Sequence, residues 1–173
     1  PGEIHCLAGE NGSGKSTLIK VISGVHEPDS GTIEINGRTW TKMTPLEAID
    51  AGVQVIYQDF SVFPNLTVME NLALTTEVAA GRKLVNWKRF RKIAEEAVVK
   101  IGFTVDLDAK VGELSVADKQ LVAICRALMS DAKLIVMDEP TTALTKHEVD
   151  ALFSIISDLK ARGIAILFVS HKL

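Results

Sequence analysis

One eight-residue stretch has the spacing that a polyphosphate-binding loop requires. Residues 9–16 read Gly-Glu-Asn-Gly-Ser-Gly-Lys-Ser, which satisfies G-x-x-x-x-G-K-[ST] in full. Glycines let backbone N–H groups point inward around a phosphate chain, and the N-terminus of the following helix adds positive potential. We therefore expect Lys15 to reach the β- and γ-phosphates of a nucleotide and the Ser16 hydroxyl to hold Mg²⁺.

Two adjacent carboxylates supply the second half of the predicted chemistry. Asp138 and Glu139 follow residues 134–137, which are continuously apolar and typical of a buried strand. In open α/β sheets, ligands bind beyond the carboxyl ends of such strands. We expect Asp138 to hold Mg²⁺ through water and Glu139 to polarise an attacking water. Without the phosphate loop, Asp138 and Glu139 would be interpreted as two solvated acids in a loop. The phosphate loop in the same chain favours a functional site instead.

Positioning both groups requires a parallel sheet. Four short apolar runs are predicted as strands, at residues 4–8, 53–57, 134–137 and 164–169. The last two are apolar throughout, as parallel strands covered on both faces are. Residues 31–37 instead alternate and end in Asn36-Gly37, a hairpin signal, which predicts a small antiparallel flap at about residues 31–40.

The predicted fold class is therefore α/β. Residues 1–59 and 131–173 are predicted to form the core, and residues 60–130, which carry helical patterns and no convincing strand, an inserted helical subdomain. Capping boxes predict four helix starts, at Thr44 with Glu47, Thr67 with Glu70, Ser115 with Asp118, and Thr145 with Glu148. Left-handed helix stops are predicted at Gly24, Gly52, Gly102 and Gly163. Apolar stripes within residues 87–101, 121–128 and 149–159 are predicted to face the core.

Composition excludes several classes of protein. The 173 residues predict one domain or one domain with a small appendage, and 47% hydrophobic with 24% charged residues is ordinary for a globular chain. The longest apolar run has six residues, residues 164–169, far below the roughly 20 of a membrane-spanning helix. A net charge of −3 gives no overall electrostatic footprint for nucleic acid.

Two smaller features allow only general interpretations. Cys6 and Cys125 form no C-x-x-C pair, which predicts a reducing compartment and two buried thiols. Six basic residues cluster with no acid between them, namely Arg82, Lys83, Lys88, Arg89, Arg91 and Lys92. A solvated helix face is the expected interpretation; contact with a membrane subunit or with anionic lipid remains an alternative.

Taken together, the motifs resemble the ATPase domain of ABC transporters. The motifs that occur in that family's order are residues 9–17, Gln58, Leu114-Ser115, Asp138-Glu139-Pro140 and His171. Four stretches further resemble the first ATPase domain of bacterial sugar importers of the ribose, galactose, arabinose and xylose group, namely residues 9–17, 64–68, 111–117 and 137–144. The likeness covers essentially the whole chain and implies the fold of P-loop NTPases.

The resemblance implies an ATPase that uses ATP and Mg²⁺ to power sugar import. The implied nucleotide contacts are Gly9, Asn11, Gly12, Ser13, Gly14, Lys15, Ser16 and Thr17, joined by Ser115, which would bind the ATP held by an opposite domain. Gln58 would contact the metal or the attacking water, and His171 the γ-phosphate and Glu139. The implied catalytic residues are thus Glu139, His171 and Gln58, and the implied metal site is Ser16, Gln58 and Asp138.

The resemblance also implies the partners. They are a second ATPase domain, in the same polypeptide or in a dimer, transmembrane permease subunits and, indirectly, a periplasmic sugar-binding protein, with no nucleic acid. The implied location is the cytoplasmic face of the cell membrane.

Three rival classes of ATP-using protein share part of this pattern. DNA-repair ATPases carry long coiled-coil insertions, whereas only 99 residues separate Lys15 from Ser115 here. Translation-associated ABC proteins are closer, but they favour an unaltered glycine signature. An adenylate-kinase-like phosphotransferase would need an acceptor pocket and a lid, for which the sequence gives no signal.

The chain departs from the family pattern at three places. Asp118 stands where the sugar-importer branch has Gln, and Thr145 where many relatives have the aspartate of the D-loop. The acid at position 118 is expected to weaken the positive field at that helix end. The chain also lacks the upstream strands that carry an adenine-stacking aromatic residue and stops soon after His171. A fragment truncated at both ends, with weak nucleotide affinity and little turnover, is therefore expected.

Overall fold

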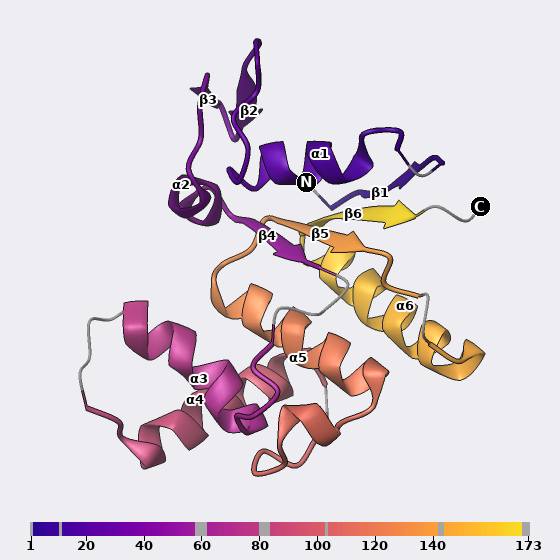
Figure 1. Ribbon diagram of the computed structural model, residues 1–173. Coiled ribbons are helices and arrows are strands. Elements are labelled where there is room, and N and C mark those ends of the chain that lie inside the picture. The colour runs from indigo at the N-terminus through magenta and orange to yellow at the C-terminus, as the bar shows by residue number, and fades with distance from the viewer. Residues whose placement is uncertain are drawn as a thin grey trace. The chain divides into compact units, whose positions relative to one another are not determined.

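The computed structural model describes residues 2–10, 12–57, 62–79, 84–102, 104–141 and 144–170. The chain divides into two compact units. The first comprises residues 1–58, 131–140 and 156–173, and the second residues 59–130 and 141–155. Figure 1 shows the elements of both, coloured along the chain.

A four-stranded parallel sheet organises the first unit (Figure 1). Its order is β1-β6-β5-β4, and the bounds are β1 Ile4–Ala8, β4 Val53–Ile56, β5 Leu134–Asp138 and β6 Ala165–Ser170. All three strand pairs are parallel. The prediction of a parallel α/β sheet is confirmed, with the four strands displaced by at most one residue at either end.

Helix α1 (Lys15–Ile22) packs on this sheet through one fully buried side chain. Ile19 lies in a core cluster with Val136 of β5 and Val169 of β6. Gly24 follows the C-cap residue Ser23; its φ is 73°, and an added Cβ would meet the backbone of Thr44. Only glycine fits that close approach.

The predicted antiparallel flap is present as a two-stranded sheet. Strands β2 (Ile33–Ile35) and β3 (Arg38–Trp40) pair across a turn in which Asn36 and Gly37 have φ values of 52° and 75°. Left-handed values at both residues are what a two-residue hairpin turn needs. Helix α2 (Pro45–Asp50) follows and begins with the complete capping box predicted for Thr44.

The second unit is helical. Its elements are α3 Val68–Ala79, α4 Trp87–Ile101, the 3-10 turn η1 Val111–Glu113 and α5 Val116–Met129. Helix α6 (Lys146–Ala161) begins in the second unit and ends in the first. The predicted caps at Thr67 and Thr145 form, with the side chains of Glu70 and Glu148 accepting from the N-cap backbone. No helix among the described residues is long and apolar enough to span a membrane.

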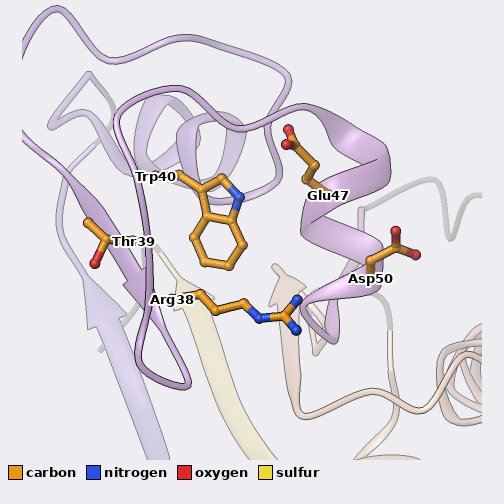
Figure 2. Close-up of a pocket in the computed structure, with 5 residues that line it drawn as sticks. All are labelled: Arg38, Thr39, Trp40, Glu47 and Asp50. Atoms are coloured by element: carbon orange, nitrogen blue, oxygen red, sulfur yellow. The ribbon is translucent and has the colours of Figure 1, made fainter.

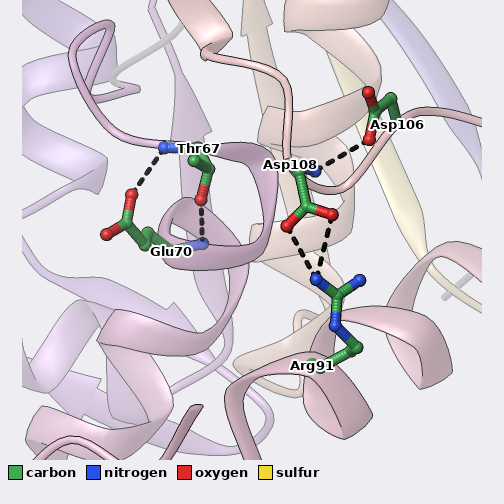
Figure 3. A network of polar contacts seen from close by, with 5 residues as sticks. All are labelled: Thr67, Glu70, Arg91, Asp106 and Asp108. Atoms are coloured by element: carbon green, nitrogen blue, oxygen red, sulfur yellow. Dashed lines mark hydrogen bonds and ion pairs between the residues drawn. The ribbon is translucent and has the colours of Figure 1, made fainter. Parts of the chain in front are cut away.

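Acidic side chains neutralise part of the basic cluster on α4. The guanidinium of Arg91 donates to both carboxylate oxygens of Asp108, at 2.7 and 2.9 Å, and Asp106 in turn accepts from the backbone N–H of Asp108 (Figure 3). Arg89 pairs at 2.7 Å with Glu77, whose side chain is buried. Arg82 and Lys83 lie outside the described residues.

Three burial predictions are wrong. Cys6 is exposed because β1 is an edge strand and lacks full cover in the first unit, whereas Cys125 is buried as predicted. Trp87 is 56% exposed, at the first turn of α4, where it meets the Phe90 ring edge-on at 5.7 Å. Phe153 of α6 is 43% exposed.

Candidate functional site

The phosphate loop and the acid pair lie at one edge of the parallel sheet. Ala8, the last residue of β1, is level with Ser170 of β6, and Asp138, the last residue of β5, is level with Val169. The carboxyl ends of three adjacent strands therefore coincide. Strands lie about 4.8 Å apart, which puts the ends of β1 and β5 about 10 Å from each other. A nucleotide's phosphate tail spans such a distance.

The loop's backbone adopts left-handed geometry at two glycines. Gly12 and Gly14 have φ values of 85° and 89°, which side-chain-bearing residues rarely adopt. Gly14 is the N-cap of α1 and provides no side chain to cap it, and α1 has no acid in its first turn, where every residue is described. Its first N–H groups therefore remain available to an anion.

Lys15 folds back over the same loop. Its ammonium Nζ donates to the carbonyl oxygens of Gly9 and Glu10 at 2.6 and 2.8 Å and to Ser13 Oγ at 3.4 Å. Several loop oxygens thus hold a positive charge beside the uncapped end of α1. Backbone amides and an ammonium are the groups that suit a polyphosphate.

The acid pair combines burial with mutual repulsion. Burial first, and then the neighbouring Glu139 charge, raise the pKa of Asp138 above the ordinary aspartate value, while the Lys15 charge opposes the shift. Lys15 is thus close enough for its charge to act on Asp138. Glu139 has a φ of 51°, and its N–H donates to the Val169 carbonyl at 2.9 Å, which fixes the turn. A left-handed non-glycine residue at a strand end is a form of local strain that concentrates at functional sites.

The residues present suit a hard divalent cation held partly by water. Ser16 lies in the first turn of α1, and Asp138 ends β5. A hydroxyl and a carboxylate are the oxygen ligands that Mg²⁺ prefers, with waters filling its remaining positions. Among the described residues, no group of three or more His, Cys, Asp or Glu side chains gathers as a metal site. The oxygen donors of Ser16 and Asp138 fit Mg²⁺.

The structure describes two of the remaining predicted site residues. Ser115 lies in the second unit, at the N-cap of α5; its hydroxyl donates to Asp118 Oδ2 at 2.9 Å, and its oxygen accepts from the Asp118 N–H at 3.1 Å. Thr17 lies in the exposed first turn of α1. Asn11, Gln58 and His171 lie outside the described residues.

Two features had no clear signal in the sequence. A hollow of about 440 Å³ between the flap and α2 is lined by Arg38, Thr39, Trp40, Glu47 and Asp50, and Figure 2 shows the Trp40 ring and the Arg38 side chain on one side of it. The side chain of Gln120 on α5 is 1% exposed. No motif marks either position, because each depends on residues from separate elements.

The chain matches the sequence pattern of the family described as "ABC transporter" over residues 1–142. It is 48% identical over its whole length to the D-allose import ATP-binding protein AlsA of Escherichia coli and 45% identical to the ribose import ATP-binding protein RbsA of Geobacillus kaustophilus. In both cases it spans about a third of the relative, 34% and 35% of the length.

Solved structures with the same fold are also ATP-binding cassettes. The ADP conformation of MJ1267, an ATP-binding cassette of an ABC transporter, matches with a TM-score of 0.85 and 32% identity over 99% of this chain and 71% of that one. A post-hydrolysis dimer of the cassette MJ0796, bound to ADP and Pi, matches with a TM-score of 0.78 and 27% identity over 99% and 75%.

Proposed function

Because this chain belongs to the ABC transporter family, we propose that it is the ATP-hydrolysing part of a sugar importer. The observation that carries the proposal is the shared sheet edge: the loop that holds Lys15 follows the end of β1, and Asp138 ends β5 at the same level of the sheet. The names of these relatives, a D-allose import and a ribose import ATP-binding protein, support sugar as the cargo.

We further propose residues 60–130 as the helical subdomain, inserted in a core of residues 1–59 and 131–173.

The proposed reaction is the attack of water on the γ-phosphorus of ATP. The water oxygen bonds to phosphorus, the bond to the β–γ bridging oxygen breaks, and Glu139 takes the water proton. The loop amides and Lys15 position and neutralise the phosphates, which is the main contribution in phosphoryl transfer. Ser16 and Asp138 would hold Mg²⁺, which would supply further neutralisation of the phosphate charge.

Three further residues complete the proposed machinery. Gln58 would orient the metal or the water, and His171 would contact the γ-phosphate and Glu139. Ser115 would bind ATP that is held by a second ATPase domain. The approach of the two domains would be transmitted to membrane permease subunits at the cytoplasmic face. The match to a dimeric cassette bound to ADP and Pi supports a two-domain arrangement.

Replacing Glu139 by Gln in the assembled transporter tests the proposal. A general base contributes about 10²- to 10⁴-fold, so we expect turnover to fall by that factor while ATP binding is retained. Glu95→Gln, at an exposed position on α4, is the matched control and should leave turnover unchanged. Turnover that survives the Glu139 substitution would show that this carboxylate is not the base.

A further inference from the structure

Two segments of the second unit that are far apart in the sequence are joined by a ladder of backbone hydrogen bonds. Residues 64–69 lead into α3, and residues 107–112 lie shortly before α5. Two of the bonds satisfy N–H groups at the start of α3, which have no partner within that helix. The N–H groups and the carbonyl oxygens that accept them, at 2.9 to 3.0 Å, are Val68 to Ala109, Met69 to Leu107, Val111 to Leu66 and Gly112 to Pro64.

The side chain of Asn71 fixes the first segment of this ladder. It is fully buried, and its Nδ2 atom donates to the carbonyl oxygens of Phe63 and Thr67 at 2.9 and 3.0 Å. The same nitrogen lies 3.4 Å from the Leu66 carbonyl oxygen, and Oδ1 accepts from the Phe63 N–H at 2.8 Å. One amide side chain therefore satisfies several backbone groups of residues 63–67, and removing it would leave those groups without a partner.

The second segment lies close against the first at Gly112. A Cβ added at this position would lie 2.9 Å from the carbonyl oxygen of Pro64. Gly112 is not one of the glycines with positive φ, so the space beside Pro64 is what favours glycine here. The neighbouring Val111 side chain is fully buried. Residues 111–112 are therefore held from both sides, by packing and by the ladder.

This second segment leads directly to Ser115. The turn η1 covers Val111–Glu113, and the N–H of Leu114 donates to the Val111 carbonyl oxygen at 3.2 Å. Ser115 follows as the N-cap of α5. Because only residues 113 and 114 separate Gly112 from Ser115, a displacement of the ladder also displaces the start of α5.

We propose that Asn71 is a positioning residue for Ser115. The Asn71 amide fixes residues 63–67, and the ladder passes that constraint to residues 111–112 and the N-terminus of α5. Asn71 is buried and bonds backbone groups, so it acts through Ser115 and not on a substrate. The proposal rests on the proposed function, in which Ser115 binds ATP held by a second ATPase domain.

Asn71→Ala tests the ladder without reference to ATP. Hydrogen exchange and backbone amide shifts of the ¹⁵N-labelled chain are compared with those of the parent. We expect the amides of Val111 and Gly112 to exchange about 3- to 10-fold faster, the effect of one lost hydrogen bond, and the Ser115 amide to shift. Asn86→Ala removes the N-cap side chain of α4 in the same unit and is the matched control, which should leave these amides unchanged.

The assembled transporter tests the consequence for turnover. Asn71→Ala should lower kcat by about 10- to 100-fold, because a misplacement of about 1 Å far from the chemistry can cost that much. Binding of ATP·Mg²⁺ to the isolated chain should be unchanged, since residues 9–16 belong to the other unit. Asn86→Ala should change neither quantity. Full turnover in an Asn71→Ala transporter, with the Ser115 amide shifted, would overturn the positioning role.

Gly112→Ala is an independent variant that keeps the Asn71 side chain. Its methyl group would press on the Pro64 carbonyl oxygen, so we expect the Ser115 amide to shift and kcat to fall while ATP binding is retained. Failure of the proposed function would show differently, as full turnover in Glu139→Gln, and the amide shifts would still decide whether Asn71 sets the position of Ser115. Unchanged exchange and shifts in both ladder variants would overturn the proposal.

Discussion

The N-termini of α1 and α5 both carry residues expected to meet phosphate, but they are built in opposite ways. At α1 the N-cap is Gly14, and the fully described first turn contains no capping side chain and no acid. At α5 the N-cap is Ser115, whose oxygen accepts from the Asp118 N–H, and Asp118 adds a negative charge. The first helix end leaves its amides to a ligand, whereas at the second the Ser115 side chain satisfies the N–H of Asp118.

Helices α2 and α6 show what an internally satisfied start looks like. Glu47 and Glu148 accept hydrogen bonds from the backbone N–H and hydroxyl of Thr44 and Thr145, and these bonds lower the pKa of each carboxyl. The starts of α2 and α6 are thus satisfied by side chains of the same helix. The missing cap of α1 is therefore as informative as the glycines that precede it.

The largest effect should come from removing the cation at the open helix end. Lys15→Ala deletes the ammonium that lies in the loop, and charge-assisted hydrogen bonds of this type are worth about 10- to 100-fold in affinity. We expect ATP·Mg²⁺ binding to the chain, measured by calorimetry, to weaken by that factor. Lys20→Ala, in the last turn of α1, should leave binding unchanged. Equal losses in both variants would indicate a general charge effect.

Alanine substitutions at two glycines with positive φ distinguish backbone strain from a role in nucleotide binding. An added Cβ at Gly14 or at Gly37 meets no atom within 4 Å among the described residues, but both positions have positive φ. Gly14→Ala and Gly37→Ala should each lower the free energy of unfolding by about 1–2 kcal/mol. Only the Gly14 variant should also lose ATP affinity, because the hairpin turn holds no ligand. A loss of affinity in the Gly37 variant would break the distinction.

Removing the negative charge of Asp118 should make the N-terminus of α5 more like that of α1, which has no acid in its first turn. Asp118→Gln in the full-length transporter should tighten ATP-driven closure, and because a charge at a helix terminus is worth about 0.3–1 kcal/mol, the KM for ATP should fall by about two- to fivefold. Asp150→Gln, at an exposed position on α6, is the control. Unchanged nucleotide affinity and turnover would reject the idea that Asp118 weakens this end.

The smallest effect concerns the stability of the acid pair. The raised pKa of Asp138 means that folding favours its protonated form. Its contribution to stability is therefore present at low pH and is lost as pH rises from the ordinary value of 3.8 through the higher folded value. Asp138→Asn should thus be more stable than the parent chain at pH 7 and equally stable at pH 3, measured by urea unfolding. A destabilised variant at pH 7 would contradict the shift.

Most of the local structure could be predicted because its causes lie within a few residues. Thr44 with Glu47 forms its capping box, and Asn36-Gly37 forms its turn, since each depends on neighbouring backbone groups. Burial was harder to predict. The pattern that buries Phe90 on α4 also includes Trp87, yet Trp87 lies in the first turn and remains exposed.

The sequence by itself determined the loop of residues 9–16, because a phosphate cradle is made by consecutive backbone amides and glycine conformations. It also determined that Asp138 and Glu139 end a buried strand. Only the tertiary structure decided that the strand order β1-β6-β5 brings these two parts to the same edge of the sheet. It also decided the exposure of Cys6 on an edge strand and the pairing of residues 64–69 with residues 107–112. These features depend on contacts between distant segments, which no local spacing encodes.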